Sequence, residues 1–309
     1  LQVLDYGAKG DNKTDNTAAF TSAIAALGTD GGIVYVPPGN YVFEGSLTIP
    51  EDVSMVGSYQ APSSHTMGQN GQFPSEGSVL QPRYGRGNAT ATPFLSLMSN
   101  AAVRGVVVWH DMQVCSPTPV PYPWTIDLVG VNSAVMDSEL LNSYQAIRAV
   151  QAGRHYIARV QGQLLLSGIF IDETYDIGRV ENVHFNPWWC NVATQFATEQ
   201  GNFMTIGRSD WEYVFNTFIF GSATGYKFIK TETGSCNGNF VGIGADLASN
   251  ASVLVEDSDL WGILIDNGEF TSFCTEKSFC NNATKAYDST QIVILASNHG
   301  DVRISNSAF

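Results

Sequence analysis

The feature that most constrains this chain is a pair of short apolar strands that recurs along its length. Each full copy has an apolar strand, a polar turn, a second alternating strand and then Asn-x-x-Phe. Such repeats are typical of a solenoid, in which each coil packs on the preceding one and buries a shared apolar face. Three copies match the whole pattern and two match it less closely: residues 169–185, 253–270 and 293–309, then 204–219 and 124–141.

The asparagines of these copies are predicted to lie at a tight turn, because asparagine tolerates the left-handed backbone conformation. Stacked at one corner of successive coils, they would form a structural ladder, and the phenylalanines would stack in the core. The asparagines lie 34, 51 and 39 residues apart, more than a plain coil needs, so loops that carry function are expected between them. The residues are Asn182, Asn216, Asn267 and Asn306, with Phe185, Phe270 and Phe309.

The N-terminal stretch predicts one helix followed by strands. Thr14 to Thr17 are helix-capping residue types, and the next ten residues place apolar side chains at spacings of four and three. Gly28 is expected to end this helix in a left-handed conformation. Gly31-Gly32 then lead into the strand IVYV, which Pro37-Pro38-Gly39 ends.

This order of residues resembles the N-terminal entry of the pectate-lyase-like superfamily of right-handed parallel β-helices. The resemblance implies an all-β solenoid with an N-terminal α-helix that caps one end, where strand edges would otherwise be exposed. It implies a single domain over residues 1–309, of which 1–45 form the cap and first coil. The superfamily includes polysaccharide lyases, glycoside hydrolases, epimerases and phage tailspikes. The matching residues are Tyr6-Gly7-Ala8, Gly10-Asp11, Thr14 to Phe20, Gly31 to Gly39 and Tyr41.

The chain stops at Phe309 directly after an alternating strand, without the polar capping segment that a solenoid needs. We therefore expect that the natural protein continues, or that a second domain or subunit covers this end. An oligomer formed through this end is one alternative. A structural half of a larger two-solenoid enzyme is another.

The composition of the chain limits the classes of partner that we expect it to bind. The chain has 29 acidic and 15 basic residues, a net charge of −14, and no Lys/Arg cluster, so a nucleic acid partner is not expected. No run of about 18 apolar residues occurs, so no membrane span is expected. Only 14% of residues are charged, which suits a secreted protein that binds neutral polar ligands. Four glycosylation sequons agree with secretion: Asn12, Asn88, Asn250 and Asn282.

The five cysteines cannot all pair within the chain, and none has zinc-site spacing. Cys274 with Cys280 is the most plausible disulfide. The alternative is that the cysteines are small buried apolar residues.

The candidate site is expected between His184 and Asp246, where aromatic residues and carboxylates gather. Sugar sites combine aromatic rings, which cover the apolar face of a sugar, with carboxylates that act on the glycosidic oxygen. Asp210 and Glu212 are the predicted catalytic pair because aromatic residues flank them, and Asp246 follows a Gly-rich bend that permits close approach. The groove would run along one sheet, between inserted loops. Predicted substrate-binding residues are Trp188, Trp189, Trp211, Tyr213, Arg208, His184 and Glu269.

Two of these substrate-binding residues are expected to share a surface stripe. The aligned copies place His184 and Glu269 at the same strand position, two residues after the asparagine. This position faces away from the phenylalanine, so it points outward, and Phe218 occupies it in the coil between them.

The predicted function is a secreted enzyme, a glycoside hydrolase acting on a plant, algal or microbial polysaccharide, with no cofactor and no metal site. A polysaccharide lyase is the first alternative; it needs a base, a group that neutralises the uronate, and often Ca²⁺. Asp172 to Asp176 could hold that ion but lack the spacing of a known calcium loop. The polygalacturonase pattern is absent, and Asn298-His299-Gly300 matches it only in part. The second alternative is a non-catalytic, tailspike-like trimeric module that binds glycans.

Overall fold

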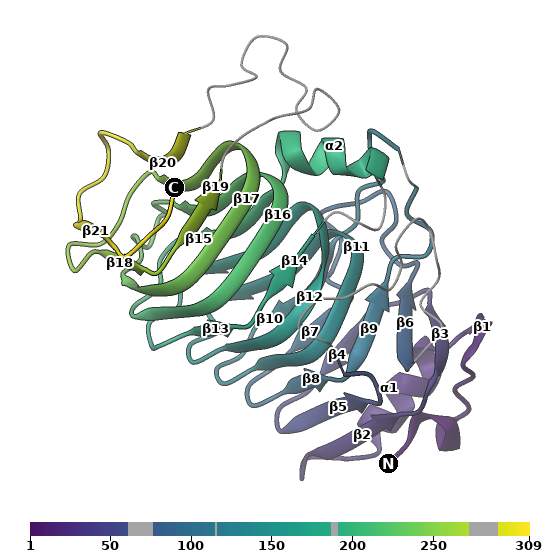
Figure 1. The fold of residues 1–309 in the computed structure, drawn as a ribbon. Helices are drawn as coiled ribbons and strands as arrows, with labels where there is room; N and C mark the ends of the chain where they lie inside the picture. Colours follow the sequence, from purple (N-terminus) through teal and green to yellow (C-terminus); the bar gives the residue numbers. More distant parts are fainter. Residues whose placement is uncertain (61–76, 115, 187–190, 272–289) are drawn as a thin grey trace.

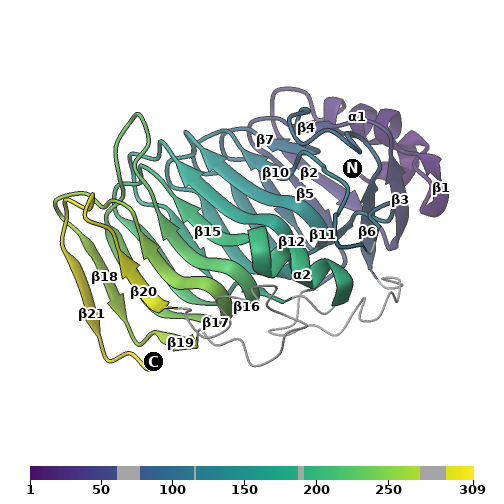
Figure 2. The same ribbon diagram turned by 90° about the horizontal axis from the view of Figure 1, so that it is seen from above.

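Strand pairing organises the whole chain, because each strand pairs in parallel with the strand one coil earlier. The structure, a computed structural model, describes residues 1–60, 77–114, 116–186, 191–271 and 290–309. All pairings between its named strands are parallel. The result is an elongated parallel β-helix, with the N-terminal strands at one end and the C-terminal strands at the other (Figures 1 and 2). The predicted all-β solenoid is confirmed.

Three parallel ladders run along the stack, and each complete coil contributes one strand segment to each ladder. Ladder A contains β2 (Gly32–Val36), β5 (Val53–Gly57), β8 (Ala102–Arg104), β13 (Arg179–Glu181), β18 (Ile263–Asp266) and β21 (Val302–Ser305). Ladder B contains β1 (Asp11–Asp15), β3 (Gly39–Phe43), β6 (Ser78–Pro82), β9 (Val106–Trp109), β14 (His184–Phe185) and β19 (Glu269–Thr271). Ladder C contains β4 (Leu47–Ile49), β7 (Leu95–Leu97), β10 (Trp124–Leu128), β15 (Asn202–Ile206) and β20 (Thr290–Ile294).

Four long strands bend through all three ladders and form whole coils by themselves. Their first, middle and last parts pair in ladders A, B and C in turn. They are β11 (Ala134–Val150), β12 (Tyr156–Asp172), β16 (Glu212–Phe228) and β17 (Gly238–Val255).

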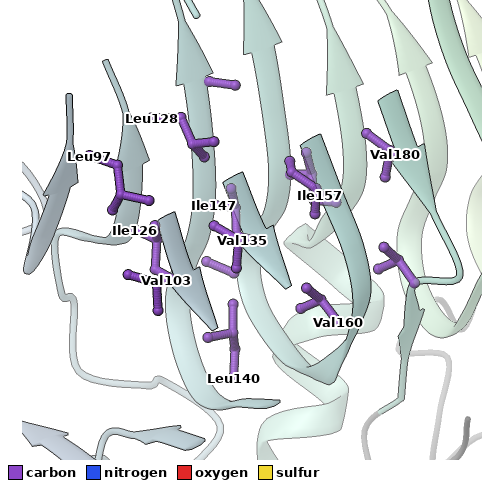
Figure 3. Packing of buried hydrophobic residues seen from close by; sticks show 14 of the residues in the cluster. Leu97, Val103, Ile126, Leu128, Val135, Leu140, Ile147, Ile157, Val160 and Val180 are labelled. Carbon is purple, nitrogen blue, oxygen red and sulfur yellow. The ribbon is translucent and has the colours of Figure 1, made fainter. Parts of the chain in front are cut away.

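The core is a set of aligned aliphatic stacks. In ladder A, Val103, Val135, Ile157 and Val180 occupy the same position in successive coils, and all four are buried (Figure 3). Alternate residues of a strand point to opposite faces, so the residues directly before and after each of these four face outward. Register is therefore fixed, because a one-residue slip would turn every buried side chain toward solvent.

The turn between ladders A and B explains the repeated asparagines. Their φ angles are 54° at Asn182, 50° at Asn216, 53° at Asn267 and 49° at Asn306, so the predicted left-handed turn is confirmed. Asn216 donates to the side-chain oxygen of Asn182 at 2.7 Å. The ladder is not continuous, because Gly242 occupies this turn in the coil between Asn216 and Asn267.

The predicted N-terminal helix is present as α1 (Thr17–Ala25), after the short 3₁₀ helix η1 (Val3–Tyr6). Helix α1 packs against η1 and β4 near the first coils and buries Phe20 in the common core (Figure 1). Gly28 follows with φ 66°, as predicted. A second helix, α2 (Asn191–Gln200), was not predicted; it lies in the long connection between ladders B and C and contacts β12 and β16.

Of the remaining predictions, some are confirmed by the structure, one is wrong and one lies outside the described residues. Phe185 and Phe270 are buried as expected, but Phe309 is 67% exposed, with its ring centroid 5.9 Å from that of Phe270. Cys236 is buried and unpaired. The predicted Cys274–Cys280 disulfide lies outside the described residues. Within the described part of the chain, no helix has the length and hydropathy of a membrane span.

Phe20 gives a direct test of the packing of α1. Its ring contacts Tyr41 and Phe43, with centroids 5.4 and 4.8 Å apart, and it has no exposed surface. Phe20→Ala should lower the free energy of unfolding by about 3–5 kcal/mol, because it leaves a cavity under the helix. Chemical denaturation measures this, with the exposed neighbour Thr21→Ala as the control. Equal stability of the two variants would contradict the packing described.

Candidate active site

Charged and aromatic side chains gather where ladder C turns into ladder A. We call this corner the C–A edge; over the central and C-terminal coils it consists of turns 129–133, 151–155, 173–178, 207–211, 229–237, 256–262 and 295–301. Because parallel strands all run in the same direction, the residues that follow ladder C come together at this edge in every coil. Residues far apart in the sequence are thus brought into contact there.

A cavity of about 180 Å³ opens on this edge over the C-terminal coils. Its lining comes from four turns and combines cationic, anionic and hydroxyl groups. The lining residues are Arg208, Lys230, Gly234, Ser235, Asp257, Ser258, Asp259, Leu260 and His299.

Asp257 and His299 form a dyad in this cavity. Asp257 accepts a hydrogen bond from the Ser235 hydroxyl at 2.6 Å, from the His299 backbone amide at 3.0 Å and from His299 Nδ1 at 2.9 Å. Burial opposes ionisation of Asp257, but these hydrogen bonds outweigh it and lower the pKa of the carboxyl. An ionised Asp257 requires the proton of His299 on Nδ1, which leaves Nε2 of this mostly exposed ring available to a ligand.

A second carboxylate and an arginine complete the cavity. Asp259 is partly exposed, and its Oδ1 accepts the Trp261 backbone amide at 3.1 Å. One residue separates Asp257 from Asp259, so their Cα atoms are at most about 7 Å apart. Arg208 is held by Asp210, with 2.7 Å between Nε and Oδ1. Asp210 therefore orients a cation that lines the cavity.

Exposed aromatic rings flank the cavity. Trp211 and Trp261 are 47% and 74% exposed, and their ring centroids are 6.5 Å apart. Trp211 occupies a left-handed turn position with φ 60° immediately before its strand begins. Large exposed rings of this kind can cover the apolar face of a sugar, and two of them side by side form a platform.

Beneath the turns, Glu212 is completely buried. Its carboxylate accepts the Ser209 hydroxyl at 2.7 Å and lies 3.1 Å from Nε2 of His155, which is buried as well. His155 Nδ1 lies 3.0 Å from the Ala152 carbonyl oxygen. Both ring nitrogens thus face acceptors, so the His155–Glu212 pair holds one proton between its two side chains. A polymer cannot reach this carboxylate, and the pair instead links two parts of the C–A edge that are two coils apart.

Comparison with known proteins identifies the family to which this chain belongs. A family model described as rhamnogalacturonase A/epimerase, pectate lyase-like, matches residues 1–263. The chain belongs to this family.

Curated relatives match this chain over short segments. Alginate lyase 7 of Azotobacter vinelandii is 46% identical over 63 residues, which are 18% of this chain and 7% of that protein. Rhamnogalacturonase A of Aspergillus niger is 50% identical over 42 residues, 14% of this chain and 9% of that protein. The chain thus covers less than a tenth of the length of either relative.

A solved structure supports the fold over the whole chain. DFA-IIIase from Arthrobacter chlorophenolicus A6, solved as its C387A mutant with DFA-III, aligns with a TM-score of 0.62 at 12% identity. The alignment covers 100% of this chain and 86% of that one. At this identity the likeness concerns the fold alone.

The residues predicted from sequence do not all lie in one place. Arg208, Asp210 and Trp211 lie together at the C–A edge, next to the cavity. Glu212 is beneath them in the interior, and Tyr213 points outward from ladder A. Trp188 and Trp189 lie outside the described residues.

His184, Asp246 and Glu269 belong to the outer face of ladder B. The register aligns His184 with Phe218, Phe218 with Gly244 and Gly244 with Glu269, so the predicted alignment of His184, Phe218 and Glu269 is confirmed. Asp246 accepts the Thr271 hydroxyl at 2.7 Å on the same face. This face is a different side of the coil from the C–A edge, so these residues are separate from the cavity.

Sequence reasoning missed Asp257, Asp259, His299 and Trp261. Asp257-Ser258-Asp259 is an acidic pair in a turn that directly follows a core strand, and this signal could have been used. His299 falls in the Asn298-His299-Gly300 segment that was not counted as a match. Asp257 and His299 are 42 positions apart in the sequence, so the sequence does not reveal that they are in contact.

The His155–Glu212 pair predicts a pH-dependent contribution to stability. Burial lowers the pKa of His155, but the Glu212 carboxylate outweighs it, and the net pKa in the folded protein is raised. A raised folded pKa means that the contribution is fully present below the unfolded value of about 6.5 and is lost as pH rises through the folded value. Glu212→Gln should thus cost about 3 kcal/mol near pH 6 and clearly less near pH 9.

Urea unfolding at the two pH values measures this difference. Glu256→Gln is the matched control, because it breaks the partly exposed Lys227–Glu256 ion pair of 2.9 Å and should cost less than about 1 kcal/mol. A Glu212→Gln cost that is the same at both pH values would contradict the shared-proton arrangement.

Proposed function

We propose that the protein is a polysaccharide-active enzyme, specifically a glycoside hydrolase, whose catalytic site is the cavity on the C–A edge. The observation that carries the proposal is the Asp257–His299 dyad beside Asp259 in a cavity flanked by exposed tryptophans. Membership of a family described by rhamnogalacturonase A and epimerases supports the substrate class.

The exposure of the three groups suggests their roles. Asp257 is buried and ionised, so it acts as a positioning residue that fixes the His299 tautomer. His299 Nε2 then accepts a proton from the attacking water as general base. Asp259 is partly exposed and donates a proton to the leaving glycosidic oxygen. Arg208, oriented by Asp210, and Lys230 stabilise negative charge on the substrate.

A lyase is the second candidate, because the cavity also presents Arg208, Lys230 and His299. Elimination needs a base to remove a proton next to the uronate carboxylate and a cation to neutralise that carboxylate. In this reading His299 is the base and Arg208 the neutralising cation. Product analysis separates the two reactions, because only elimination creates a double bond that absorbs ultraviolet light.

We also propose a capping role for helix α1 and secretion of the protein. Helix α1 would cover the N-terminal end of the core, which its buried Phe20 supports. Secretion is supported by the exposed positions of three sequon asparagines, Asn12, Asn88 and Asn250.

Variants of the cavity test the hydrolase on a panel of rhamnogalacturonan, polygalacturonate, alginate and β-1,3-glucan. Wild type should release reducing ends without ultraviolet absorbance, and Asp259→Asn should lower kcat by roughly 10²–10⁴-fold because it removes the proton donor. Asp257→Asn should also lower kcat, because an amide at this position no longer fixes the proton of His299 on Nδ1. Glu269→Gln, on the outer face of ladder B, is the control.

Full activity in Asp259→Asn, or a loss in Glu269→Gln alone, would move the catalytic site away from the cavity. Ultraviolet absorbance that rises together with the reducing ends would replace hydrolysis by elimination.

A further inference from the structure

A second cavity lies on the same C–A edge, over coils closer to the N-terminus. Its volume is about 350 Å³, and it is separate from the cavity that holds Asp257 and His299. The lining residues come from three successive turns: Val131, Gln151, Gly153, Arg154, Glu173, Tyr175 and Asp176.

The polar groups of this second cavity are held in place by one another. Arg154 is ion-paired with Asp176 and donates from Nε to Asn132 at 2.7 Å. Gln151 donates to Glu173 at 2.7 Å. Amide, carboxylate and guanidinium groups fixed in this way can donate to and accept from the hydroxyls of a sugar with little loss of side-chain entropy.

An aromatic ring and the net charge indicate the type of sugar. Tyr175 is 57% exposed and supplies a ring face for stacking. Arg154 contributes one positive charge and Glu173 and Asp176 contribute two negative charges, so the lining is net negative. A uronate carboxylate would be repelled there, whereas a neutral sugar would not.

Tyr175 also connects the two cavities. The guanidinium carbon of Arg208, which lines the first cavity, lies 5.7 Å from the centroid of the Tyr175 ring, which lines the second. Arg154 and Asp259 lie four coils apart, which corresponds to roughly 19 Å along the stack. An oligosaccharide lying along the C–A edge can therefore occupy both cavities.

We propose that the second cavity is a binding subsite for a neutral sugar residue of the same polysaccharide whose glycosidic bond lies in the first cavity. This inference rests on the proposed function for the identity of the ligand. It adds a specificity determinant, because a substrate must then carry a neutral sugar several residues from the cleaved bond.

Gly153 provides a selective way to close this subsite. A Cβ atom at Gly153 would meet its nearest neighbours, in Asp176 and Val131, at 3.7–3.8 Å, which is ordinary van der Waals contact. Its φ lies outside the left-handed region, so a side chain is compatible with the backbone. Gly153→Ala should leave the cavity open, whereas Gly153→Leu should fill it.

Affinity electrophoresis in gels that contain each polysaccharide of the panel measures binding without requiring turnover. Wild type and Gly153→Ala should be retarded by at least one polysaccharide, and Gly153→Leu should bind it about tenfold more weakly. Thermal unfolding should show the same midpoint for Gly153→Ala and Gly153→Leu. Tyr175→Ala removes the stacking ring and should weaken binding independently of any change at Gly153.

The outcomes separate this inference from the proposed function. Equal retardation of Gly153→Leu, Tyr175→Ala and wild type overturns the subsite, as does the absence of retardation of wild type by every polysaccharide. Loss of retardation in both Gly153→Leu and Tyr175→Ala supports the subsite, whether or not reducing ends are released. If the product analysis detects no reaction on any polysaccharide, this result contradicts the proposed hydrolase but not the subsite.

Discussion

The structure depends on parallel, in-register pairing between successive coils. Each strand takes its backbone hydrogen bonds from the equivalent strand one coil away, so equivalent residues stack in rows. The inward rows form the aliphatic core, represented by Val103, Val135, Ile157 and Val180. The turns obey the same rule: whatever follows ladder C in one coil lies beside whatever follows it in the next.

This stacking turns a one-dimensional sequence into a continuous edge with two cavities. Asp257 meets His299 because both follow ladder C in adjacent coils, although they are far apart in the chain. The buried His155–Glu212 pair supports the edge from below by joining turns of different coils. A buried, hydrogen-bonded pair beneath this edge restricts its movement, which favours the fixed geometry that the two proposed binding sites need.

Most of the fold could be predicted from local patterns. The capping residues before α1, the left-handed asparagines and the alternating strands each specify their own backbone conformation. Helix α2 was missed because it lies in an inserted connection with no repeat to compare with. Arg208, Asp210 and Trp211 were identified as a group because they are neighbours in sequence, and Glu212 was grouped with them because sequence proximity does not reveal burial.

By itself the sequence determined the repeated coil and the class of fold, because strand alternation and turn chemistry are encoded within a few residues. Only the tertiary structure decided which face of each coil carries which group. It separated Asp246 and Glu269 from the cavity, buried Glu212 against His155, and joined Asp257 to His299. The physical reason is register: the coil on which a residue lands depends on every inserted loop before it, and loop lengths have no local signature.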